Sequence, residues 1–181
     1  ANQVTLNGDL TVGGSNNLGL TGAITGTAGL IKEGAAKLTL SGANNYAGNT
    51  RLNAGGIVVG TSTSLGQGSL IAADGTFLEA STAVNLANAL TVAGKLSIVG
   101  DANLGLTGVI SDTPTTPGNP DIPGGLIKNG NGILSLSGAN TYTGGTVVNA
   151  GTLNIGSSSA LGSGDLTVGG AASLTTSGAQ V

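Results

Sequence analysis

The chain has 181 residues and a net charge of −3, and only 7% of its residues are charged, against about 25% in ordinary soluble domains. With five Lys and Arg residues it lacks the basic surface that binds nucleic acid or anionic lipid. The absence of Cys and His excludes triads, dyads and the usual zinc and haem ligands that use them. We therefore expect no catalytic, cofactor-binding or metal-binding residues and a chain that is not an enzyme.

Short segments of alternating apolar and small polar residues follow one another along the chain, separated by glycine-containing turns. This period of two predicts half-buried strands. Clear examples, in chain order, are residues 10–12, 38–40, 96–98, 134–136, 153–155 and 166–168. The best helical candidate, residues 81–93, is interrupted by β-branched and Asn residues, so we expect essentially no helix.

The second half of the chain repeats the first. Residues 29–60 recur at 125–156 with eighteen of 32 positions identical, and the match continues toward the C-terminus at the same shift of 96. Upstream the shift is 86, since residues 17–22 recur at 103–108. We therefore expect one continuous segment, 1–181, made of two related copies, 3–81 and 89–177.

The difference between the two shifts is a ten-residue insertion in the second copy. It lies within residues 111–124, which contain all four prolines of the chain. Proline cannot donate to a strand ladder, so this segment is predicted to be a loop. Asp112 and Asp121 flank it and could hold a cation or a partner. The simpler interpretation is that they are turn-initiating aspartates.

A long repeat that tolerates an insertion predicts a solenoid, in which each coil contacts only its neighbours. We expect an all-β, right-handed parallel β-helix with about three short strands per coil, roughly 20–25 residues per turn and about seven to nine turns. Evenly spaced strands also suit an antiparallel sandwich or barrel, which is the alternative fold.

The repeated residues closely resemble the autotransporter-associated β-strand repeat of bacterial autotransporter passengers. In the second copy the resemblance rests on residues 125–128, 134–146 and 149–153; the first copy departs at Asn49, Arg51 and Gly56. The resemblance implies a right-handed parallel β-helix, exported and displayed outside a Gram-negative-type cell. It also implies adhesion, autoaggregation or a stalk-like scaffold, and we expect the chain to be a fragment of a longer passenger.

Two pairs of equivalent residues stand out within the repeat. Tyr46 and Tyr142 both follow Gly-Ala-Asn. They could form a carbohydrate-binding platform, although rings that cap or pack over a turn are the preferred interpretation. Lys32 and Lys128 each follow Leu-Ile and are predicted to extend outward from a strand end; a shared binding role is the less favoured alternative.

Polar and acidic residues give two further expectations. Asn53 and Asn149, in Asn-Ala-Gly, are predicted to hydrogen-bond turn backbone at a coil corner. Asp74 and Glu79 are the closest pair of acids on a candidate strand. Their odd spacing places them on opposite faces, so they are not expected to cooperate as an acid–base pair.

These observations favour a non-enzymatic structural or adhesive segment of a secreted or surface-displayed autotransporter-type protein, which mediates adhesion, autoaggregation or biofilm contacts. Its partners would be copies of itself, or a host or abiotic surface, with no nucleic acid and no embedding in the membrane. A pure spacer or a fibre unit that stacks end to end is the alternative. A polysaccharide-cleaving β-helix enzyme is a third hypothesis.

Overall fold

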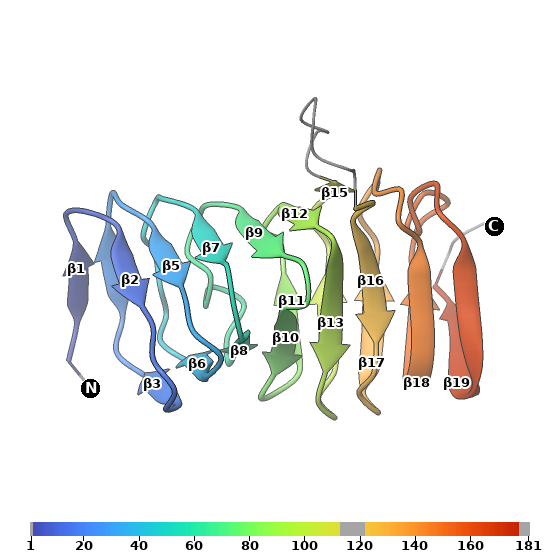
Figure 1. Ribbon diagram of the computed structural model, residues 1–181, viewed down its shortest axis with the longest axis horizontal. Helices are drawn as coiled ribbons and strands as arrows, with labels where there is room; N and C mark the ends of the chain where they lie inside the picture. Colours follow the sequence, from blue (N-terminus) through green and yellow to red (C-terminus); the bar gives the residue numbers. More distant parts are fainter. Residues whose placement is uncertain (1, 113–121, 178–181) are drawn as a thin grey trace.

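The chain winds into a parallel β-solenoid of about eight turns, with no helix in residues 2–112 and 122–177, which the computed structural model describes (Figure 1). The first strand, β1 (Val4–Leu6), and the last, β19 (Leu166–Thr176), lie at opposite ends of the body. The predicted all-β parallel β-helix and its number of turns are confirmed, and the antiparallel alternative is wrong, because every strand pair is parallel.

The strands occupy three faces, which we number in the order in which the chain visits them. The first face holds β1, β4 (Ile24–Gly26), β11 (Val84–Leu86), β14 (Leu104–Leu106) and β17 (Ile133–Leu136). The second holds β2 (Leu10–Val12), β5 (Leu30–Lys32), β7 (Thr50–Leu52), β9 (Leu70–Ala73), β12 (Leu90–Ala93) and β15 (Ile110–Asp112). The third holds β3 (Leu18–Leu20), β6 (Lys37–Leu40), β8 (Gly56–Val59), β10 (Phe77–Ala80), β13 (Lys95–Val99) and β16 (Gly125–Lys128).

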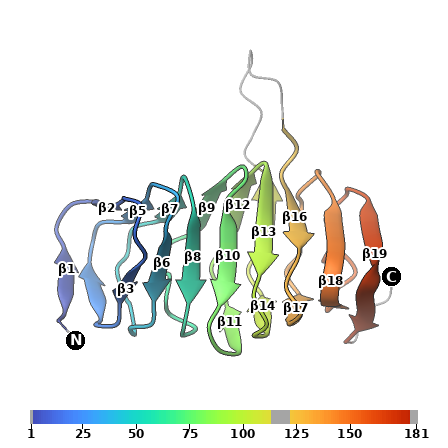
Figure 2. The same cartoon turned by 60° about the horizontal axis from the view of Figure 1, so that its bottom comes forward.

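Two long strands join the third face to the first. The beginning of β18 (Thr146–Ile155) pairs with β16 and its end pairs with β17, and β19 runs alongside it over both parts. The ladder of β18 and β19 is interrupted between Val148 and Ala150, where the chain turns the corner. These two strands therefore join the third face and β11, β14 and β17 of the first face into a single sheet of eleven strands, whereas β1 and β4 form a separate two-stranded sheet (Figure 2).

The strand register gives the length of each coil. Leu10 pairs with Leu30, and Leu30 pairs with Thr50, so one coil takes 20 residues. The register is still 20 at Val92 and Asp112 but is 30 where Lys95 pairs with Gly125. Ten extra residues thus lie between Asp112 and Gly125, and residues 113–121 of this loop, with Asp121, lie outside the described part of the chain.

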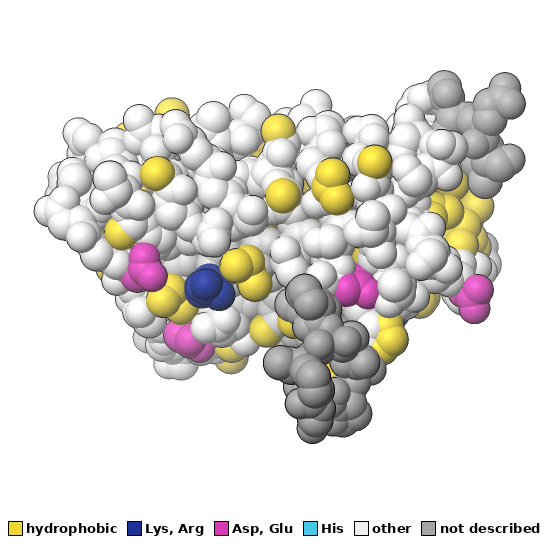
Figure 3. Space-filling view, turned by 90° about the horizontal axis from the view of Figure 1, so that it is seen from above, with side chains coloured by type: hydrophobic (Ala, Val, Ile, Leu, Met, Phe, Trp, Pro, Cys, Tyr) yellow, Lys and Arg dark blue, Asp and Glu magenta, His cyan; other side chains and the backbone are white. Residues whose placement is uncertain are grey.

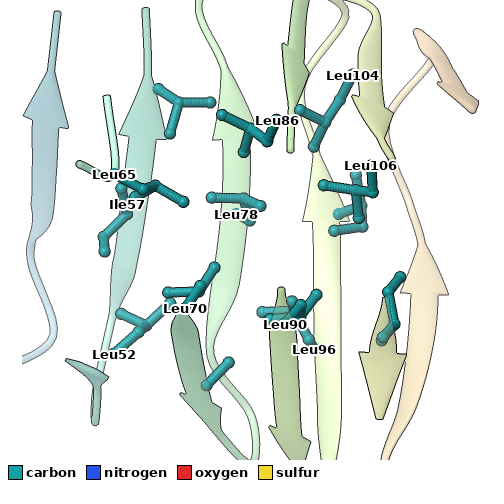
Figure 4. Close-up of a cluster of buried hydrophobic side chains, with 14 of the residues drawn as sticks. Leu52, Ile57, Leu65, Leu70, Leu78, Leu86, Leu90, Leu96, Leu104 and Leu106 are labelled. Atoms are coloured by element: carbon teal, nitrogen blue, oxygen red, sulfur yellow. The ribbon is translucent and has the colours of Figure 1, made fainter. Parts of the chain in front are cut away.

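The interior of the solenoid is filled by stacked aliphatic side chains. Because alternate residues of a strand point inward, each coil places a Leu or Ile directly above that of the coil before. One such row, on the third face, consists of Leu38, Ile57, Leu78 and Ile98, all of them buried. Figure 4 shows part of this narrow core. Each buried side chain contributes roughly 1.5–3 kcal/mol.

Asn side chains complete the backbone hydrogen bonding where strands end. The side-chain oxygen of Asn17 accepts the Lys37 N–H, one coil later, at 2.9 Å. Asn49 serves Ser69 in the same way at 3.0 Å. These exposed side chains accept backbone N–H groups of the next coil and so continue the coil-to-coil hydrogen bonding at the ends of the strands.

The two copies of the repeat lie on different faces of the solenoid. The Leu-Ile-Lys strand is β5 on the second face in the first copy and β16 on the third face in the second. The shift of 86 residues between the copies equals four coils of 20 residues plus six residues. Six residues separate Val4 in β1 from Leu10 in β2, so the second copy begins one face further round the coil.

Candidate functional site

Lys32 is a buried structural residue, and the prediction that it extends outward is wrong. Its side chain is 2% exposed. The ammonium donates hydrogen bonds to the carbonyls of Glu33 at 2.6 Å, Gly34 at 2.7 Å and Ala54 at 3.2 Å. Alternation along β5 explains the error: Lys32 is two residues after the buried Leu30, so it shares the inward side of the strand.

Lys128 repeats this arrangement and corrects the same prediction. It too is 2% exposed, and its ammonium donates to the carbonyls of Gly130 and, at 3.4 Å, Ala150. Burial lowers the pKa of both Lys32 and Lys128 from the usual value of a lysine. Each ammonium therefore binds corner carbonyls and is not available to a ligand.

The two tyrosines are fully buried, so they offer no carbohydrate-stacking platform. The Tyr46 hydroxyl lies 2.5 Å from the Thr50 hydroxyl, and the Tyr142 hydroxyl lies 2.6 Å from that of Thr146. Burial raises the pKa of Tyr46 to about 12 and raises that of Tyr142 as well. The rings pack inside a turn, as preferred in the sequence interpretation, with their single polar atom satisfied.

Gly66 packs against the ring of Tyr46. It has φ = +65°, and a Cβ there would approach the Tyr46 carbonyl oxygen to 2.6 Å and the ring to 2.9 Å. Only glycine combines this left-handed conformation with such a close approach. Gly162 takes the same place over Tyr142, with φ = +63°.

Asn44 and Asn140 are structural residues that the sequence interpretation missed. The Asn44 side chain accepts the Ile24 N–H at 2.9 Å and donates to the Ser64 carbonyl at 2.7 Å, which ties three successive coils together. Asn140 makes the equivalent bonds, and the two side chains are 3% and 4% exposed. The signal was present, because both asparagines occur in the identical Ser-Gly-Ala-Asn of the two copies.

Asn53 and Asn149 bind other side chains, so the prediction that they bond turn backbone is wrong. The Asn53 amide donates to the Glu33 carboxylate at 2.7 Å, and the Asn149 amide donates to the Asn129 side-chain oxygen at 2.7 Å. In both pairs the partner lies one coil earlier at the same corner. These exposed contacts form short polar ladders along the axis.

The acids singled out in the sequence have separate partners. Asp74, in the turn after β9, accepts the Lys95 N–H at 2.7 Å. Glu79, in β10, forms an ion pair with Lys37 at 2.7 Å. The two carboxylates therefore bind different groups.

Asp112 also bonds to the next coil. Its oxygens accept the Thr143 N–H at 2.9 and 3.0 Å and the Thr143 hydroxyl at 2.5 Å. Within residues 2–112 and 122–177, no three His, Cys, Asp or Glu side chains are placed to hold a metal ion. Nor does this part of the chain form a helix of the length and apolarity needed to cross a membrane.

The outer surface is mostly uncharged. Figure 3 shows that acidic and basic side chains are sparse and scattered on the face it presents. On the first face, a groove of about 540 Å³ crosses β11, β14, β17, β18 and β19. Its lining residues are Ala83, Val84, Asn85, Asn103, Leu104, Gly105, Ile133, Ser135, Asn154, Thr175 and Thr176.

Comparison with known proteins identifies the repeated unit. Residues 30–59 and 126–155 match the passenger-associated-transport-repeat family. These two segments are autotransporter passenger repeats. Each repeat begins at the first inward Leu of a Leu-Ile-Lys strand and includes the buried lysine, the bridging asparagine and the tyrosine–threonine pair. The resemblance predicted from sequence is thus confirmed.

One curated relative extends the match beyond the passenger repeats. The chain is 39% identical over 147 residues to the adhesin BmaC autotransporter of Brucella suis biovar 1 (strain 1330). The aligned part is 76% of this chain but 4% of that adhesin, so the chain spans a small part of its length. No solved structure matches this chain.

Proposed function

We propose that this chain is a non-enzymatic, adhesive segment of a surface-displayed autotransporter-type protein. Its partners are other copies of itself, or a host or abiotic surface. Passenger repeats and an adhesin relative support display outside the cell. The observation that carries adhesion is the outer surface, which presents uncharged amide and hydroxyl groups in rows that follow the axis.

The difference between the buried and the exposed residues of the passenger repeats supports this proposal. Lys32, Asn44 and Tyr46, which are identical in both copies, are buried, and Lys32 and Asn44 bond to the following coil. The buried residues therefore stabilise the fold, and we assign the adhesive function to the exposed residues. With few charges there, two such surfaces can approach without strong electrostatic repulsion.

Surface display tests the proposal directly. The chain is fused to a translocator and shown on non-adherent cells, and autoaggregation and retention on host cells and plastic are measured. The control is the same fusion without this segment. We expect faster settling or greater retention with the segment. If neither changes while antibody labelling shows equal display, adhesion is wrong.

A spacer is the second candidate, favoured by a specific observation. The strands form uninterrupted hydrogen-bonded ladders, from β2 to β15 on the second face and from β3 through β18 to β19 on the third. Such a body separates what is attached to its two ends (Figure 1). A spacer predicts that deleting whole coils shortens the reach of a displayed tip epitope without changing adhesion, whereas an adhesive segment loses adhesion.

A further inference from the structure

We propose that the groove on the first face binds a neutral polysaccharide chain, laid along the solenoid axis across β11, β14, β17, β18 and β19. This deepens the adhesive function proposed above by naming a ligand class. The volume of about 540 Å³ lies within the range of about 300–1,000 Å³ that small-molecule ligand sites have.

The chemistry of the lining selects an uncharged ligand. Among the described residues, none with an ionisable side chain lines the groove. An ionic group placed there would lose hydration without gaining a counter-charge. A purely apolar ligand is also disfavoured, because it would cover the amides of Asn85, Asn103 and Asn154 without giving them hydrogen bonds.

The groove offers two kinds of contact that a sugar needs together. Hydroxyl and amide groups come from Ser135, Asn154 and Thr175, which are held to one another by long bonds of 3.3 Å that a ligand can replace. Ile133 stands at the edge with 39% of its surface exposed and gives an apolar contact for C–H groups. A polyhydroxylated ring satisfies both.

The register explains why the ligand would be a polymer. Gly105, Ser135, Asn154 and Thr175 are consecutive partners across four coils. Parallel strands are spaced about 4.7–4.9 Å apart, so a chain that follows the axis meets the polar side chains of Ser135, Asn154 and Thr175 one coil after another.

Gly105 shapes the groove floor. A Cβ at this position would meet the side-chain oxygen of Asn85, which lies over the glycine, and its nearest backbone atom would be 3.6 Å away. The missing side chain therefore lets Asn85 lie against the sheet. A larger residue would push this amide up into the groove while leaving the backbone undisturbed.

The equivalent surface of the first copy carries an ion pair. Lys37 and Glu79, joined by an ion pair at 2.7 Å, stand where the second copy has Ile133 and Thr175. The same strand scaffold thus carries a charged bridge in one copy and an open, uncharged groove in the other.

Two glycines provide a matched test. Gly105→Thr fills the groove floor. Gly19→Thr changes the same Leu-Gly-Leu motif in the first copy, where no heavy atom lies within 4 Å of the added Cβ, and serves as the control. Circular dichroism and thermal unfolding check that both variants fold.

The purified chain is applied to an array of neutral and acidic glycans, and titration calorimetry with the strongest neutral oligosaccharide gives the affinity. We expect binding of neutral glycans only, weakened at least tenfold by Gly105→Thr and unchanged by Gly19→Thr. Absence of neutral-glycan binding, equal binding of acidic glycans, or an unaffected Gly105→Thr variant overturns the proposal. So does concentration-dependent dimerisation that Gly105→Thr abolishes in the absence of glycan, since the groove would then bind a second copy.

The purified assay is independent of cell adhesion. If the chain binds neutral glycans but displayed cells do not adhere, the proposed function fails and the site stands. If displayed cells adhere equally with Gly105→Thr and the array shows no binding, the site fails and adhesion resides elsewhere.

Discussion

The two copies of the passenger repeat have similar buried side chains but different exposed side chains. Leu38 and Leu134, at equivalent positions, are both fully buried, although one lies on the third face and the other on the first. On the outside, the Lys37–Glu79 ion pair corresponds to the uncharged Ile133 and Thr175. The interior is fixed by packing against neighbouring coils, while the exterior is free to differ, and this contrast can be tested.

The largest effect is expected in the core rows. Leu38→Ala and Leu134→Ala each remove a fully buried side chain and leave a cavity, so each should lower the free energy of unfolding by about 2–5 kcal/mol. Urea unfolding measures both. Similar losses are expected because the interiors are alike; tolerance of one substitution but not the other would break the equivalence of the copies.

The bridging asparagines come next. Asn44→Ala leaves the Ile24 N–H and the Ser64 carbonyl without their buried partner and should cost about 1–3 kcal/mol; Asn140→Ala should cost about the same. Asn45→Ala, at the exposed neighbouring position, is the control and should change stability by less than about 0.5 kcal/mol. Equal effects at Asn44 and Asn45 would contradict the bridge.

The tyrosines allow a spectroscopic comparison of the copies, because the chain has only two. Ultraviolet titration should show both phenols with a pKa raised above the ordinary value of tyrosine, with Tyr46 ionising near pH 12. Since the folded pKa is raised, the stabilisation is complete below about pH 10 and is lost as the pH rises toward 12. Tyr46→Phe should cost about 0.5–1.5 kcal/mol and leave only the Tyr142 transition. A phenol that titrates at its ordinary value would show that its ring is solvated.

The smallest effect is expected at the outer ion pair. Lys37 and Glu79 have side chains that are 43% and 23% exposed, so Lys37→Ala should cost only about 0.2–1 kcal/mol, and less at high salt. Ile133→Ala, the counterpart in the second copy, should change stability little and show no salt dependence. A loss at Lys37 as large as that at Leu38 would mean that the exterior also holds the coils together.

Sequence reasoning succeeded where one periodicity decided the outcome. The repeat and its tolerance of ten extra residues were sufficient to predict parallel coils, because only stacked neighbours need to match. It failed at Lys32 because charge was given more weight than strand alternation, and a ring of corner carbonyls can replace water around an ammonium. It missed Asn44 because a partner 20 residues away in both directions becomes visible only with the register known.

The sequence alone determined that this chain is a solenoid with two related copies of a repeat, since the repeat, the glycine-marked turns and the alternating strands can all be recognised without knowing which residues meet in space. The tertiary structure decided how those patterns are displayed. A coil of 20 residues turns an 86-residue shift into an offset of one face, so equivalent residues point in different directions. The coil length decides which residues of successive coils lie side by side, and therefore which exposed residues form the groove on the first face.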